Sequence, residues 1–184
     1  MTRLALKPAS NPTPKPILVP VLPADRKPSA DFDFFMGIWN CRHRYRVRRL
    51  ADCHDWIEFD GTCAARKILA GFGNCDESHI GLPGCPYRGV AFRTWDPERE
   101  LWSIYWLDSR QPGRLAPPVR GGFEDTRAGR LGTFLGDDAF AGRAIRVRYL
   151  WSRIAAGAAR WEQAFSLDEG NSWETNWIMD FTRV

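Results

Sequence analysis

The feature that most constrains the fold is an alternation of apolar and polar residues with a period of two. It begins at Ile38 and continues almost to the end of the 184-residue chain. Such a period predicts β-strands, because successive side chains of a strand point to opposite faces. In the clearest stretch Trp39, Cys41, His43, Tyr45 and Val47 alternate with Asn40, Arg42, Arg44, Arg46 and Arg48. This stretch predicts a strand with one buried and one solvated face.

Nine further stretches of this kind follow, and turn residues separate them. They are 56–68, 74–80, 87–95, 101–108, 119–125, 129–135, 143–154, 158–167 and 173–182. No amphipathic helix is indicated between them, so the pattern predicts an all-β sandwich or barrel. Large residues on successive inward faces, such as Trp151 and Trp177, favour a closed antiparallel barrel with a wide interior. Hairpin pairing of the first two strands is expected to set Arg46 opposite Glu58 and Arg44 opposite Asp60.

The chain divides into a leader and one domain. Residues 1–28 contain seven prolines, which predicts an extended, disordered leader, and residues 29–184 are predicted to form the barrel. Ser29 is a candidate cap for a short N-terminal helix or 3₁₀ turn over 31–35, which Gly37 would end.

Charge and cysteine content limit the partners. Residues 1–30 hold five Lys or Arg against one acid, whereas residues 31–184 hold 21 of each. The folded part is neutral, which argues against a nucleic-acid partner. No apolar run is long enough to cross a membrane, and no secretory signal is recognised. Five cysteines without a C-x-x-C pair indicate reduced thiols, so we expect a cytoplasmic protein. The sequence leaves the oligomeric state open and is compatible with a homodimer.

Gly37-Ile38-Trp39, at the start of the first long strand, resembles the G-x-W signature of lipocalins and the wider calycin superfamily. The resemblance implies that Trp39 packs against an arginine near the end of the last strand, where Arg183 stands. Stretches such as Trp102-Ser103-Ile104-Tyr105-Trp106 are similar to a largely uncharacterised bacterial branch of calycin-like domains of unknown function. The likeness covers about residues 31–184 and implies a calycin-type barrel with a pocket, but no reaction.

The alternation along each strand indicates which side chains point into the barrel and would surround a ligand. They are His43, Tyr45, Trp106, Asp108, Tyr149, Gln163, Thr175 and Trp177, with Arg88 included if Val90 and Phe92 point inward. A few polar groups in an apolar cage are typical of a ligand pocket. An inward Arg88 would need a carboxylate, for which Asp108 is the nearest candidate.

Two functions fit these residues. In the first, the barrel binds a small apolar or aromatic metabolite. In the second, it is a cofactor-independent enzyme of the isomerase, cyclase or hydrolase type in secondary metabolism, with His43 and Asp108 as the acid–base pair. The enzyme hypothesis predicts that His43 or Asp108 has a perturbed pKa and touches the cavity.

Other motifs are better explained as structure. Residues 166–173 fit the Asp-box pattern S-x-D-x-G-x-[ST]-W, in which Asp168 would accept backbone N–H groups of a hairpin loop. Cys75, His79 and Cys85 match no closed zinc module, and Asp137 and Asp138 point apart on an extended chain. Related barrels bind haem, but here all three histidines lie in the first half of the chain, so we expect neither metal nor cofactor.

Overall fold

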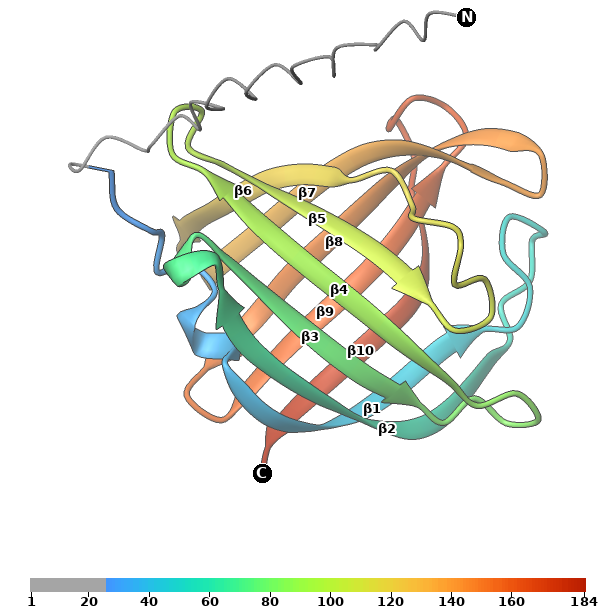
Figure 1. Ribbon diagram of the computed structural model, residues 1–184. Helices are drawn as coiled ribbons and strands as arrows, with labels where there is room; N and C mark the ends of the chain where they lie inside the picture. Colours follow the sequence, from blue (N-terminus) through green and yellow to red (C-terminus); the bar gives the residue numbers. More distant parts are fainter. Residues whose placement is uncertain (1–25) are drawn as a thin grey trace, which may run out of the picture.

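The computed structural model describes residues 26–184, whose ten antiparallel strands close into a barrel (Figure 1). The strands are β1 (Gly37–Arg46), β2 (Trp56–Ile68), β3 (Gly73–Ile80), β4 (Tyr87–Asp96), β5 (Leu101–Asp108), β6 (Val119–Thr126), β7 (Gly129–Phe140), β8 (Arg143–Ala155), β9 (Ala158–Ser166) and β10 (Glu174–Arg183). Each strand pairs with its neighbours in sequence, and β10 pairs with β1 to complete the ring. The predicted all-β barrel of about ten strands is confirmed. Most of the predicted leader lies outside the described residues.

The register of the first hairpin differs from the prediction by two residues. Arg46 faces Trp56, so Arg44 faces Glu58 and Arg42 faces Asp60. The charges still neutralise one another across the strands, because Arg42 lies 3.0 Å from Glu58 and 3.1 Å from Asp60. These pairs are exposed and contribute at most about 1 kcal/mol each.

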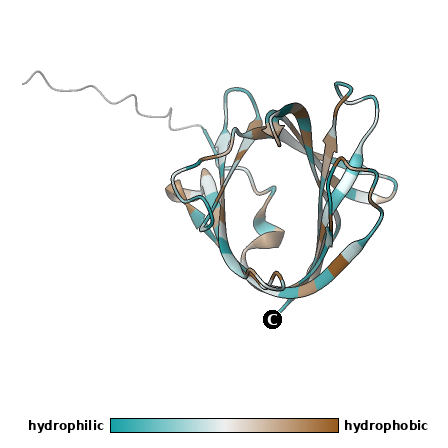
Figure 2. Cartoon of the chain, turned by 90° about the vertical axis from the view of Figure 1, so that its right-hand side faces the viewer, coloured by the Kyte–Doolittle hydropathy of each residue, from teal (hydrophilic) through white to brown (hydrophobic). Residues whose placement is uncertain are grey.

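One end of the barrel is filled by aromatic side chains that precede β1. The expected short helix is only a 3₁₀ turn, η1 (Asp33–Phe35), and residues 26–184 contain no α-helix. Phe32 is buried with its ring edge-on to Trp102 at 5.0 Å, and Phe35 packs against Trp151 at 4.8 Å. Figure 2, which looks along the barrel, shows the turn inside the ring of strands. This end is therefore plugged.

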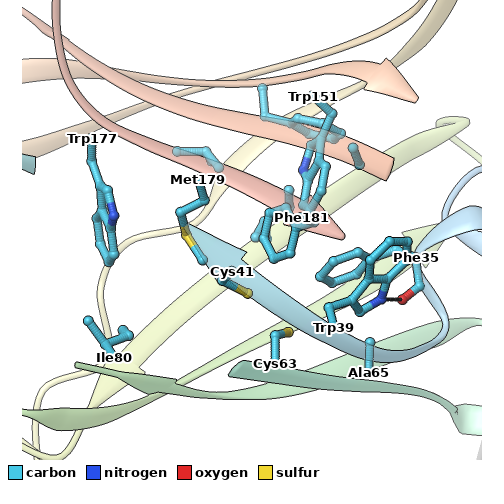
Figure 3. Packing of buried hydrophobic residues seen from close by; sticks show 14 of the residues in the cluster. Phe35, Trp39, Cys41, Cys63, Ala65, Ile80, Trp151, Trp177, Met179 and Phe181 are labelled. Atoms are coloured by element: carbon cyan, nitrogen blue, oxygen red, sulfur yellow. Dashed lines mark hydrogen bonds between the residues drawn. The ribbon is translucent and has the colours of Figure 1, made fainter. Parts of the chain in front are cut away.

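Trp39 and Arg183 fasten the plug to the strands. Trp39 Nε1 donates a hydrogen bond to the Phe35 carbonyl at 2.8 Å (Figure 3). The Arg183 guanidinium lies 4.1 Å from the centre of the Trp39 ring and donates to the carbonyl of Phe34 at 2.6 Å. Gly37 has φ +123°, and a Cβ there would lie 2.6 Å from Arg183 Nη1, so this position needs glycine. The packing of Trp against Arg that the resemblance implied is confirmed.

The opposite end, which we call the mouth, gathers the connections 47–55, 81–86, 109–118 and 167–173 (right-hand side of Figure 1). Elsewhere, η2 (Leu69–Gly71) joins β2 to β3 at the plugged end. The five cysteines are free thiols. In the part of the chain that is described, no helix has the length and apolar character needed to cross a membrane.

Candidate functional site

Two hollows follow one another along the barrel axis. The inner cavity, of about 60 Å³, lies next to the plug and has Phe35 in its lining. The mouth pocket, of about 410 Å³, opens between the loops. Both are lined by the same four residues, which we call the collar: Trp106, Tyr149, Gln163 and Trp177. All four are among the ligand-binding residues predicted from the sequence. The inner cavity has room for a few water molecules or one edge of a ring, and the mouth pocket is within the usual size of ligand sites.

The collar is built by close packing of aromatic rings. Trp177 stands perpendicular to Trp106 at 6.0 Å and to Trp161 at 5.4 Å. Trp106 lies directly over Gly89, where a Cβ would approach its ring carbon Cη2 to 2.1 Å. Burial raises the pKa of Tyr149 to about 12, so its hydroxyl keeps its proton and can donate to a ligand.

A buried ion pair forms the polar side of the inner cavity. Arg93 Nη1 donates to Asp76 Oδ1 at 2.6 Å and to Asn74 Oδ1 at 2.9 Å, and both side chains of the ion pair are 5% exposed. The hydroxyl of Ser78 lies 3.5 Å from the other oxygen of Asp76. The cavity thus offers a fixed cation and a fixed carboxylate in an otherwise aromatic wall.

Sequence reasoning missed this pair, although one signal could have found it. In β3 the inward residues Asn74, Asp76 and Ser78 are polar and are followed by buried Ile80. The run of inward polar side chains required a cationic partner on a neighbouring strand, and Arg93 of β4 is that partner.

The register of β4 also changes the role of Arg88. Tyr87, Ala91 and Arg93 point inward, so Arg88 points outward, where it lies 3.6 Å from Glu77. The expected ion pair between Arg88 and Asp108 is not formed. Alternation alone could not fix the face of β4, because both of its faces carry apolar residues and an arginine.

Asp108 lies in the wall of the mouth pocket, as predicted, but it is held by another arginine. Arg110 donates to it from Nε at 3.0 Å and from Nη2 at 2.7 Å. Burial favours a higher pKa for Asp108, but the hydrogen bonds and charge of Arg110 together lower it. A carboxylate stabilised in this way is a weak base.

His43 is fully buried in the β1 wall but lines neither hollow. Its Nδ1 accepts a hydrogen bond from Trp177 Nε1 at 3.1 Å, and its ring stacks on Phe59 at 4.8 Å. Burial lowers its pKa to about 4, so at neutral pH it is uncharged and its proton is on Nε2. The pKa is perturbed as the enzyme hypothesis requires, but His43 reaches the collar only through Trp177.

A β-bulge rearranges the predicted face of β10. The register shifts between Thr175 and Trp177, which brings buried Asn176 inward, where it accepts a hydrogen bond from Gln163 at 2.8 Å. Thr175 is half-buried and lines neither hollow, whereas Trp173 stacks with Arg148 at 4.5 Å. Because the bulge reverses the alternation, Trp173 and Thr175 do not share the inward face of Trp177. Of the remaining predicted residues, Tyr45 lines the mouth pocket.

The Asp box is a turn device, as predicted. Asp168 accepts hydrogen bonds from the Ser172 N–H at 2.9 Å and from the Ser172 hydroxyl at 2.6 Å. Hydrogen bonds of this kind from Ser172 and Ser166 lower its pKa to about 2. Cys75, His79 and Cys85 are not brought together, and residues 26–184 contain no group of three or more His, Cys, Asp or Glu that could hold a metal ion.

Comparison with known proteins supplies no relative for this site. No protein-family model matches the sequence, and no curated protein matches it.

Proposed function

We propose that the barrel binds a small, flat, largely apolar metabolite, with one edge in the inner cavity and the remainder in the mouth pocket. The observation that carries the proposal is the collar, whose four residues border both hollows. Three of them are aromatic, and flat aromatic walls favour flat ligands through stacking and edge contacts. We also infer a calycin-like barrel, supported by the packing of Trp39 under Arg183.

Binding is supported better than catalysis. An acid–base enzyme needs a group of suitable pKa within hydrogen-bond reach of the ligand. His43 lines neither hollow, and Asp108 is already engaged by Arg110. The buried Arg93–Asp76 pair is likewise self-neutralised. These groups suit orientation of a ligand more than proton transfer.

The test is a titration with an uncharged naphthyl dye, N-phenyl-naphthylamine, whose fluorescence rises in an apolar site. Wild-type protein is expected to bind one dye per chain. Ala91 lines the inner cavity beside Trp106, and Ala91→Leu fills most of that space, so it should weaken binding about ten-fold. Ala64 is exposed on the outer face of β2, and Ala64→Leu is the matched control.

Native mass spectrometry of freshly purified protein should in parallel reveal a co-purifying small molecule. If wild-type protein fails to bind the dye, or if Ala91→Leu and Ala64→Leu bind it equally to wild type, the interior is not the binding site.

A further inference from the structure

Within the described part of the chain, one arginine of the mouth pocket has no carboxylate partner. Among the residues lining this pocket, Asp108 pairs with Arg110 at 2.7 Å and Asp138 pairs with Arg114 at 3.4 Å. Arg49 is the third arginine of the lining, and it takes part in none of the ion pairs formed within residues 26–184. The pocket wall therefore carries three positive and two negative charges, and the excess resides on Arg49.

Aromatic rings take the place of a counter-ion around Arg49. Its guanidinium lies 4.1 Å from the ring centre of Tyr45, 5.7 Å from that of Phe165 and 5.8 Å from that of Phe140. Its Nε is buried without a hydrogen-bond partner in the described chain. Burial lowers the pKa of Arg49 to about 10, which leaves the group charged at neutral pH. A partly buried cation with unused donors is a favourable site for an anion.

The backbone next to Arg49 is fixed before any ligand binds. Leu50 has a positive φ of 54°, and its N–H donates to both carboxylate oxygens of Glu174 at 2.9 and 3.1 Å. Glu174 begins β10, the strand that also carries Trp177 of the collar. The backbone beside Arg49 is thus tied to the strand that carries Trp177, and little ordering of this backbone remains to be done on binding.

We infer that the ligand is an organic acid, whose anionic group binds the Arg49 guanidinium while its ring system passes into the collar. This inference rests on the proposed function. The guanidinium fork suits a carboxylate or sulfonate, both of which accept two parallel N–H donors. Because Arg110 and Arg114 are paired with Asp108 and Asp138, the net charge of the pocket wall is that of Arg49, and it favours an anion over a cation.

The test compares two dyes that differ by one charge: anilinonaphthalene sulfonate and its uncharged parent, N-phenyl-naphthylamine. Wild-type protein is expected to bind the sulfonate at least about ten-fold more tightly, because hydrogen bonds to charged groups are the strong ones. Arg49→Met should abolish this preference by weakening binding of the sulfonate, while the uncharged dye still binds. Arg49→Lys, which keeps the charge but not the fork, should retain part of it.

Arg127 supplies the matched control, since it is exposed in the turn between β6 and β7 at the plugged end. Arg127→Met changes the net charge equally and should leave both affinities unchanged. In wild-type protein, added salt should weaken binding of the sulfonate but not of the parent dye.

The two hypotheses fail in different ways. If the uncharged dye binds but Arg49→Met leaves the preference for the sulfonate intact, or wild type shows no preference, the assignment of Arg49 is wrong and the pocket stands. If neither dye binds wild-type protein, the proposed function itself is wrong.

Discussion

The buried pair of Arg93 and Asp76 allows a quantitative test of how the interior is stabilised. Asp76→Leu would leave the Arg93 cation buried without its carboxylate, and Arg93→Met would leave Asp76 without its cation. Removing one partner of a buried ion pair typically destabilises a protein by about 3–5 kcal/mol, whereas replacing both with apolar residues of similar volume is often neutral. The double variant is therefore expected within about 1 kcal/mol of wild type.

Asp76→Leu should destabilise the protein less than Arg93→Met, because Arg93 keeps more of its other contacts than Asp76 does. After Asp76→Leu, Arg93 keeps its hydrogen bond to Asn74 at 2.9 Å and remains 5.1–5.8 Å from the rings of Phe32, Phe35 and Trp151. Such contacts between a cation and a ring are each worth about 0.5–2 kcal/mol. We expect a loss of about 3 kcal/mol for this variant. After Arg93→Met, Asp76 keeps only the Ser78 hydroxyl at 3.5 Å, so the loss should be about 4–5 kcal/mol.

The assay is unfolding in guanidinium chloride at pH 7, monitored by tryptophan fluorescence. The dependence of the free energy of unfolding on denaturant concentration should be the same in all variants. A loss of 3 kcal/mol corresponds to a fall in melting temperature of about 6–12 °C for a chain of this size. If each single variant loses less than about 1 kcal/mol, or if the double variant loses the sum of the two, the pair is not coupled and the reasoning is refuted.

Two further predictions concern the collar and its support. The ordinary pKa of 6.5 for His43 falls to about 4 in the folded protein, so between these pH values the unfolded chain binds more protons. The free energy of unfolding should therefore decline by about 3 kcal/mol as pH falls from 6.5 to 4. His43→Gln should flatten this decline, whereas His79→Gln, at an exposed position, should not. Equal dependence of stability on pH in the two variants would contradict the assignment of the decline to His43. Gly89→Ala would push against the Trp106 ring and should alter near-ultraviolet circular dichroism and destabilise by about 1–3 kcal/mol. Gly122→Ala, where the added Cβ meets no atom within 4 Å, is the control that should leave the spectrum unchanged.

The strands were predictable because their period follows directly from backbone geometry. Each turn is marked locally by residues such as Gly142 or by the Asp box, so the bounds fall within a few residues of those observed, apart from the longer end of β7. The collar was also predictable, since large inward residues on β5, β8, β9 and β10 all follow the same alternation.

The remaining features depend on contacts between distant parts of the chain. Whether Arg88 or Arg93 points inward is decided by Asp76 on another strand, and the bulge at Thr175 has no signature in the alternation itself. Arg49 stands in a connection, where no period applies. Within residues 26–184, Arg49 can be recognised as the unpaired cation of the pocket only once Asp108 and Asp138 are known to pair with other arginines.

Closure of the ring by β1 and β10 has a consequence for synthesis of the chain. Trp39 pairs with Arg183 and Tyr45 with Trp177, so residues made at the start of the barrel find their partners only at its end. Until the segment 174–183 has left the ribosome, β1 and β9 present unpaired backbone edges. We therefore expect folding to be completed only after β10 has been made and released, with a rate limited by contacts distant in sequence, and nascent chains that stop short of β10 to depend on chaperones to avoid edge-to-edge aggregation.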